Sequence, residues 1–163
     1  RRGLFWQLAV LTVFEEGTRD ALAFLQADPA PERVQAAARA AGGAVRRFHD
    51  AGGRHADLHV KNLLIAEPRD GGTMGACVID LDKARHTPGL TPDERMAQVM
   101  RLFRSLLKRQ VLTTVGRRGC ACFLGAYCED DRPLRRAMLR RMDAELRVVA
   151  LHALRSPRRT GCA

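Results

Sequence analysis

Apolar and polar positions follow two different patterns along the chain, and each pattern predicts a different kind of element. In segments that begin near Glu32, Thr91 and Pro133, hydrophobic residues recur at steps of three and four residues, which is the period of an amphipathic helix. A shorter helix is predicted from Thr18 to Leu25. Runs of aliphatic and β-branched residues without that period predict buried strands. These runs lie at residues 4–14, 63–66 and 77–79.

Short sequence signals add detail to the helices. Thr91, followed three residues later by Glu94, has the composition of a capping box at a helix start. Gly42 and Gly43 lie inside a predicted helix, where each costs about 1 kcal/mol relative to alanine, so we expect a close backbone approach there. Methionines of the later helices are expected to fill the core. The inward positions predicted for the helix after Thr91 are Met96, Val99, Met100, Phe103, Leu106 and Leu107.

Two of the short strands form a predicted hairpin around a turn signal centred on Gly71. If the hairpin is symmetric about Gly71, Asn62 faces Asp80, and cross-strand neighbours lie about 5 Å apart. An amide oxygen and a carboxylate at that distance are suited to share a hard cation such as Mg²⁺. Asp57 lies in the loop five residues upstream of Asn62. We therefore expect it near the same end of the hairpin.

Composition and charge narrow the class of protein. The chain has 163 residues, of which 46% are hydrophobic, and this is enough for one domain with a buried core. Its formal charge of +10 comes from 25 arginines and 3 lysines against 18 acidic residues. Arginine richness fits a solvated surface of biased composition as well as it fits attraction to nucleic acid, an anionic membrane or a phosphorylated substrate. Because aromatic residues are few and no recognition motif is present, we expect no nucleic-acid partner.

The cysteine pattern and the lengths of the apolar runs indicate the cellular compartment of the protein. The five cysteines form no CxxC pair, and Cys120, Cys122 and Cys128 with His152 match no common zinc spacing. Free thiols in a reducing compartment are therefore expected. No apolar run has the length of a membrane span, and the first residues lack the layout of a signal peptide. These features predict a cytosolic protein.

Two acidic motifs carry a resemblance to a known family. His55-x-Asp57, followed by Asn62 and then by Asp80 eighteen positions later, is similar to the catalytic loop and metal loop of the protein-kinase-like fold. The segments "HADLHVKNLLI", "VIDLDKAR" and "RLFRSLLKR" resemble those of the lipopolysaccharide core kinases, in particular the 3-deoxy-D-manno-octulosonic acid (Kdo) kinases. The resemblance covers roughly residues 4–110. It implies an α+β fold with a mostly helical C-terminal lobe.

The resemblance implies a role for each candidate site residue. Asp57 would orient the acceptor hydroxyl and accept its proton, while Asn62 and Asp80 would hold Mg²⁺ on the ATP phosphates. Backbone groups around Val13 and Glu15 would contact adenine at the hinge. The implied acceptor is a sugar, Kdo or another inner-core sugar, of lipid-linked lipopolysaccharide. The enzyme would then be cytoplasmic and peripheral, in contact with anionic lipid at the inner face of the bacterial inner membrane.

Some parts of a kinase-like enzyme are not found in this sequence. Such enzymes hold the ATP phosphates with a glycine-rich loop and a strand lysine paired to a helical glutamate, whereas all three lysines here follow the predicted hinge. We therefore expect an N-terminally truncated chain. Its expected parts are the last strands of the N-terminal lobe and the hinge at 1–17, a kinase-like C-terminal lobe at 18–155 and a disordered tail at 156–163.

Two other functions remain open. A soluble small-molecule kinase of the aminoglycoside or choline kinase type uses a similar His-x-Asp loop. A catalytically inactive pseudokinase would keep the fold; the missing upper lobe favours it, and the intact Asp57, Asn62 and Asp80 argue against it. In a membrane-bound kinase, the arginine-rich helix at 95–109 would face anionic lipid or the acceptor. As a solvated helix face, the same arginines would carry no function.

Overall fold

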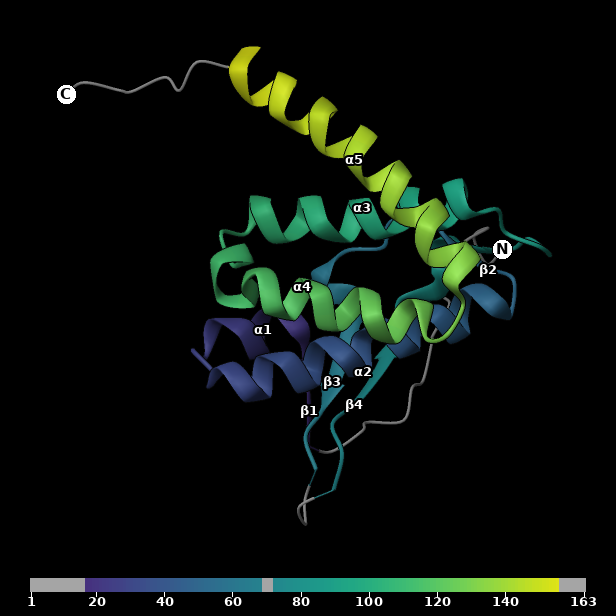
Figure 1. Cartoon of the computed structure of the whole chain (residues 1–163). Coiled ribbons are helices and arrows are strands. Elements are labelled where there is room, and N and C mark those ends of the chain that lie inside the picture. The colour runs from purple at the N-terminus through teal and green to yellow at the C-terminus, as the bar shows by residue number, and fades with distance from the viewer. Residues whose placement is uncertain (1–16, 69–71, 156–163) are drawn as a thin grey trace, which may run out of the picture.

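Helices make up most of the computed structural model, which describes residues 17–68 and 72–155 (Figure 1). The strands expected at 4–14, the hinge residues Val13 and Glu15, the turn centre Gly71 and the tail at 156–163 lie outside the described residues. The helices are α1 (Ala21–Gln26), α2 (Pro31–Asp50), α3 (Pro92–Lys108), α4 (Leu112–Cys128) and α5 (Arg132–Arg155). The strands are β1 (Thr18–Asp20), β2 (Gly53–His55), β3 (Leu63–Ala66), β4 (Gly75–Val78) and β5 (Ala84–His86). Two short 3₁₀ turns are η1 (Val60–Asn62) and η2 (Leu81–Lys83).

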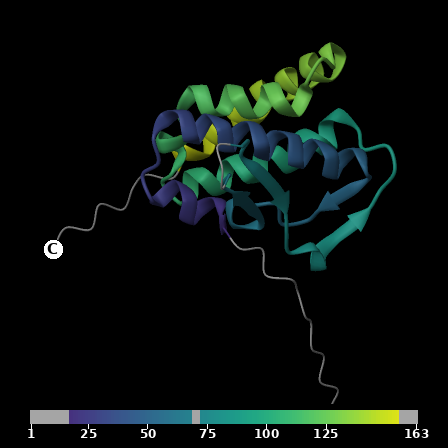
Figure 2. The ribbon, with the colours of Figure 1, turned by 90° about the horizontal axis from the view of Figure 1, so that it is seen from below.

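The long helix α2 lies at the centre of the molecule. It packs against α4 on one side and against β3 and β4 on the other, as the view in Figure 2 shows. Helix α3 packs against α5 and also touches η1. Because α2 ends at Asp50 and β2 begins at Gly53, this central helix leads directly into the loop that carries Asp57.

The strands form two small antiparallel sheets, one in the order β1-β3-β4 and one made of β2 and β5. In the hairpin of β3 and β4, Leu63 pairs with Val78. The predicted register, with Asn62 opposite Asp80, is therefore wrong by one residue. The backbone partner of Asn62 is Ile79, whose N–H donates to the Asn62 carbonyl at 3.0 Å. A turn that is one residue longer or shorter shifts every pair, and the sequence did not fix its length.

The start of the first helix also differs from the prediction. Thr18 pairs with Ala66 of β3 instead of opening a helix. Helix α1 begins at Ala21, and its N-cap is Asp20, whose carboxylate accepts a hydrogen bond from the N–H of Ala23 at 2.9 Å. Thr and Asp are both good N-cap residues. Because β1 pairs with β3, Thr18 lies in the strand and Asp20 caps the helix.

Other helix boundaries match the sequence pattern, with one omission. Thr91 and Glu94 form the predicted capping box at the start of α3: the N–H of Glu94 donates to the Thr91 hydroxyl, and the N–H of Thr91 donates to the Glu94 carboxylate. Helix α4 was not anticipated. Gly116, with φ +60°, interrupts it, so its apolar positions do not keep one helical period.

Helices α2 and α4 are in backbone contact at Gly42. A Cβ atom at this position would lie 2.3 Å from the carbonyl oxygen of Phe123, a distance that no side chain tolerates. The predicted close approach is thus confirmed for Gly42. It is wrong for Gly43, where a Cβ would meet only the guanidinium of Arg47 at 3.3 Å.

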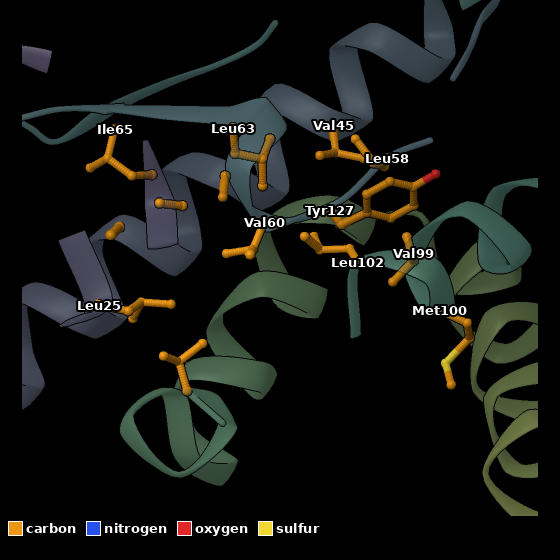
Figure 3. Close-up of a cluster of buried hydrophobic side chains, with 14 of the residues drawn as sticks. Leu25, Val45, Leu58, Val60, Leu63, Ile65, Val99, Met100, Leu102 and Tyr127 are labelled. Carbon is orange, nitrogen blue, oxygen red and sulfur yellow. The ribbon is translucent and has the colours of Figure 1, made fainter. Parts of the chain in front are cut away.

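One hydrophobic core joins the helices and strands. Figure 3 shows Leu63 and Ile65 of β3 in the same cluster as Val99 and Met100 of α3 and Tyr127 of α4. The expected core role of methionine is confirmed by the buried Met96, Met100 and Met138. Leu107 was expected to face inward, but it is 39% exposed because the core face of α3 does not extend to it.

The helices also border an apolar cavity of about 760 Å³ that is partly open to solvent. Side chains from all five helices line it, among them Phe24, Val34, Val99, Cys120 and Met142. Within the part of the chain that the structure describes, no helix combines the length and apolar character that a membrane crossing demands.

The cysteines of the described residues are free thiols, as predicted. They are Cys77, Cys120, Cys122 and Cys128. Among residues 17–68 and 72–155, no group of three or more His, Cys, Asp and Glu side chains is placed to hold a metal ion.

Candidate active site

The loop that joins β2 to β3 holds Asp57 at the surface and Asn62 in the interior. The Asp57 side chain is 56% exposed, whereas Asn62, at the end of η1, is 4% exposed. The amide nitrogen of Asn62 donates a hydrogen bond to the backbone carbonyl of Asp57 at 3.0 Å. This bond closes the loop and leaves the amide oxygen of Asn62 as the atom able to face a cation. His59 Nε2 lies 3.8 Å from Asp57 Oδ2, where a protonated ring would form an ion pair.

His55 connects this loop to the end of β4. Its ring is fully buried, and Nδ1 accepts a hydrogen bond from the N–H of Asp57 at 3.1 Å. The ring proton therefore lies on Nε2, which faces the carbonyl oxygen of Ile79 at 3.3 Å. His55 is thus a packed residue that shapes the loop, and it is not exposed as a base would be.

Asp80 follows β4 in a left-handed backbone conformation, with φ 60° and ψ 55°. It is exposed and comes directly after Ile79, which bonds the backbone of Asn62 on one side and faces His55 on the other. The structure therefore brings Asp57, Asn62 and Asp80 to one end of the hairpin. Asn62 lies opposite Ile79, so Asp80 is one position beyond its partner and the two residues do not form a cross-strand pair.

The chain that carries Asp57, Asn62 and Asp80 in this arrangement has relatives among known proteins. The model of the lipopolysaccharide kinase (Kdo/WaaP) family matches residues 1–127. The chain belongs to this family. The match runs past the expected 4–110 and includes nearly all of α4.

Two known proteins illustrate the relationship. The 3-deoxy-D-manno-octulosonic acid kinase of Vibrio parahaemolyticus serotype O3:K6 (strain RIMD 2210633) is 31% identical over 113 residues, which are 68% of this chain and 44% of the relative. The chain thus spans less than half the length of this curated relative. A solved structure, described as WaaP in complex with acyl carrier protein, superposes with a TM-score of 0.58 at 24% identity, over 79% of this chain and 58% of that chain. The likeness confirms the α+β kinase-like fold.

A polar cluster holds the end of α2, just before β2 and the loop that carries Asp57. The Asp50 carboxylate accepts hydrogen bonds from Arg46 Nε at 2.6 Å and from an Arg95 guanidinium nitrogen at 2.7 Å. His49 Nδ1 lies 2.6 Å from the hydroxyl of Tyr127. Burial, and then the charge of Arg95, lower the pKa of His49 to about 4, while burial raises the pKa of Tyr127 to about 12. Both rings are neutral at pH 7, so this hydrogen bond joins two uncharged groups.

Arg95 does not take part in the basic face expected for the helix at 95–109. The Arg95 side chain is 12% exposed and bound to Asp50, so Arg95 is not part of an exposed basic face. The sequence analysis also overlooked three residues of α3 that form hydrogen bonds with the backbone of His55, Ala56 and Val60. They are Gln98, Arg101 and Ser105. The available signal was their spacing of three and four residues along one helix face.

Proposed function

We propose that the chain carries the catalytic loop and metal loop of an ATP-dependent phosphotransferase that acts on a sugar hydroxyl of lipopolysaccharide, on Kdo or another inner-core sugar. Family membership supports this assignment, as does the 3-deoxy-D-manno-octulosonic acid kinase among its relatives. The observation that carries it is the hydrogen bond from Asn62 to the backbone of Asp57. This bond fixes the spacing between the two residues, and phosphoryl transfer depends mainly on such positioning.

In this proposal each site residue has a separate task. Asp57 is exposed, so its carboxylate is able to orient the sugar hydroxyl and to accept its proton as the oxygen attacks phosphorus. The carboxylate of Asp80 and the amide oxygen of Asn62 are hard oxygen ligands of the kind that Mg²⁺ prefers. A bound cation would neutralise charge on the ATP phosphates. The adenine contacts assigned to Val13 and Glu15 rest on the family resemblance alone.

We place the protein in the cytoplasm, peripherally attached to the inner face of the bacterial inner membrane, because a lipid-linked acceptor must be reached at a bilayer surface. The formal charge of +10 supports attraction to anionic lipid. Two exposed cations at the C-terminal end of α3, Lys108 and Arg109, would make this contact. Arg95 is excluded because Asp50 already binds it.

The test is phosphate transfer from labelled ATP to a Kdo-containing lipid A precursor, with the protein expressed from its complete reading frame. Asp57→Ala should lower kcat by about 10²–10⁴-fold, the range typical of a lost general base, and leave the thermal shift caused by Mg-ATP intact. Asp80→Asn should abolish the Mg²⁺-dependent shift. Asp82→Asn, two residues further along η2, is the matched control and should change neither.

Other outcomes point to the alternatives. Transfer to aminoglycosides or choline, but not to the lipid-linked sugar, would establish the soluble small-molecule kinase. A Mg-ATP shift without transfer to any acceptor would establish a pseudokinase. A shift that survives Asp80→Asn would remove Asp80 from the cation site.

A second proposal concerns the apolar cavity among the five helices. We propose that it receives an acyl chain, presented by an acyl carrier protein. Two observations support this proposal. The cavity of about 760 Å³ has an almost wholly apolar lining, and apolar ligands bind in such sites. The WaaP structure that shares this fold was solved in complex with acyl carrier protein.

This partner is tested by thermal unfolding of the protein with acylated and with unacylated acyl carrier protein. The acylated form should raise Tm by several degrees and the unacylated form should not, because only the acyl chain fills the cavity. Equal effects of both forms would contradict occupation of the cavity.

A further inference from the structure

Three polar side chains of α3 bond backbone groups of the loop that carries Asp57. The Oε1 atom of Gln98 accepts a hydrogen bond from the N–H of His55 at 2.7 Å. A guanidinium nitrogen of Arg101 donates to the carbonyl of Ala56 at 2.5 Å. The hydroxyl of Ser105 accepts from the N–H of Val60 at 2.9 Å. The three contacts lie on both sides of Asp57 in the sequence.

The helix period explains why one element can make all three contacts. Residues 98, 101 and 105 are separated by three and four positions, so they lie on one face of α3. An adjoining face carries Met96, Val99 and Met100 into the core, and this packing fixes the helix relative to β3. The side chains on the loop-facing face therefore project from a rigid support.

The bonded loop groups lie in a short, irregular part of the chain. Ala56 lies between β2 and η1, and Val60 is the first residue of η1. A buried backbone group without a partner destabilises the conformation that buries it, so these contacts favour one loop conformation over others. Ser105 is itself fixed, because its hydroxyl donates to the carbonyl of Leu102 at 2.7 Å while it accepts from Val60.

We propose that Gln98, Arg101 and Ser105 are positioning residues of the phosphotransfer site, through which α3 sets the conformation of the loop that presents Asp57. The inference rests on the proposed function. None of the three needs to touch substrate, because each acts through the loop backbone. A displacement of about 1 Å at a reacting group is enough to cost about 100-fold in rate, so loss of these contacts affects turnover more than nucleotide affinity.

The primary test compares Ser105→Ala with Ser105→Thr in the protein expressed from its complete reading frame. Ser105→Ala should lower kcat at least tenfold and leave KM for ATP within twofold. Ser105→Thr keeps the hydroxyl and should restore most of the turnover. Arg101→Met should behave like Ser105→Ala, whereas Arg118→Met, at an exposed position of α4, is the matched control and should match wild type.

A second measurement separates positioning from general destabilisation. In a protein that already carries Asp57→Ala, adding Ser105→Ala should lower the residual rate only slightly. The loop conformation affects the rate by positioning Asp57, which is absent in that protein. Equal losses in both backgrounds would overturn the proposal, as would a Thr variant that is as slow as the Ala variant.

Hydrogen exchange tests the same inference without relying on activity. The amide of Val60 should lose protection in Ser105→Ala, and the amide of His55 should lose it in Gln98→Leu, while amides of α2 stay unchanged. Local loss of protection in a protein that transfers no phosphate would refute the proposed function and keep the structural role of α3. Unchanged exchange at both amides would refute the role of α3 itself.

Discussion

Among single residues, His49 links the stability of the protein to pH. Burial, and then the charge of Arg95, lower the pKa of its imidazole from 6.5 to about 4. In the unfolded chain the ring titrates near 6.5. Between pH 6.5 and pH 4 the unfolded state therefore binds a proton that the folded state does not, and the free energy of unfolding falls as the pH falls through this window. Above pH 6.5 the group adds no pH dependence.

The size of this effect can be measured by urea unfolding at several pH values from 7 to 4. At about 1.4 kcal/mol for each pKa unit, His49 accounts for a loss of roughly 3 kcal/mol across the window. His49→Gln should flatten the pH dependence by that amount. His86→Gln, at an exposed position of β5, is the matched control and should keep the wild-type slope. An unaltered slope in His49→Gln would show that another group is responsible.

Among the elements, the contact of α2 with α4 limits position 42 to glycine. Gly42→Ala places a methyl group 2.3 Å from the Phe123 carbonyl oxygen, so the helices must separate, and overpacking of this kind costs about 1–3 kcal/mol. Gly43→Ala meets only the flexible end of Arg47 and should stabilise α2 by up to about 1 kcal/mol through helix propensity. Thermal unfolding of the two variants should therefore shift in opposite directions, and a stable Gly42→Ala protein would contradict the close contact.

For the whole molecule, the features that could be predicted from sequence are those that depend on neighbouring residues. The capping box of Thr91, the period of α2 and the order of Asp57, Asn62 and Asp80 are local patterns. They were sufficient for the kinase-like fold and for the family. The one-residue error in the hairpin register arose because a run of adjacent turn-forming residues, such as Asp70-Gly71-Gly72, does not show about which residue the two strands are symmetric.

Contacts between distant parts of the chain were not predictable in the same way. Helix α1 begins with Asp20 as its N-cap instead of the predicted Thr18, because Thr18 pairs with Ala66 of β3. The three contacts of α3 with the loop join residues 43–45 positions apart, and sequence spacing shows only that the side chains share a face, not what they meet. Arg95 was misplaced for the same reason, since its partner Asp50 belongs to another helix.

The left-handed backbone at Asp80 has an evolutionary consequence. Asp and Asn are the residues other than glycine that adopt this conformation most readily, so an exchange between them keeps the turn after β4 and removes the charge. A descendant with Asn at this position would keep the fold, while the proposed cation site would lose its charge. If Asp80 has the proposed role, one substitution that selection for stability does not detect would be enough to give a catalytically silent member of the family.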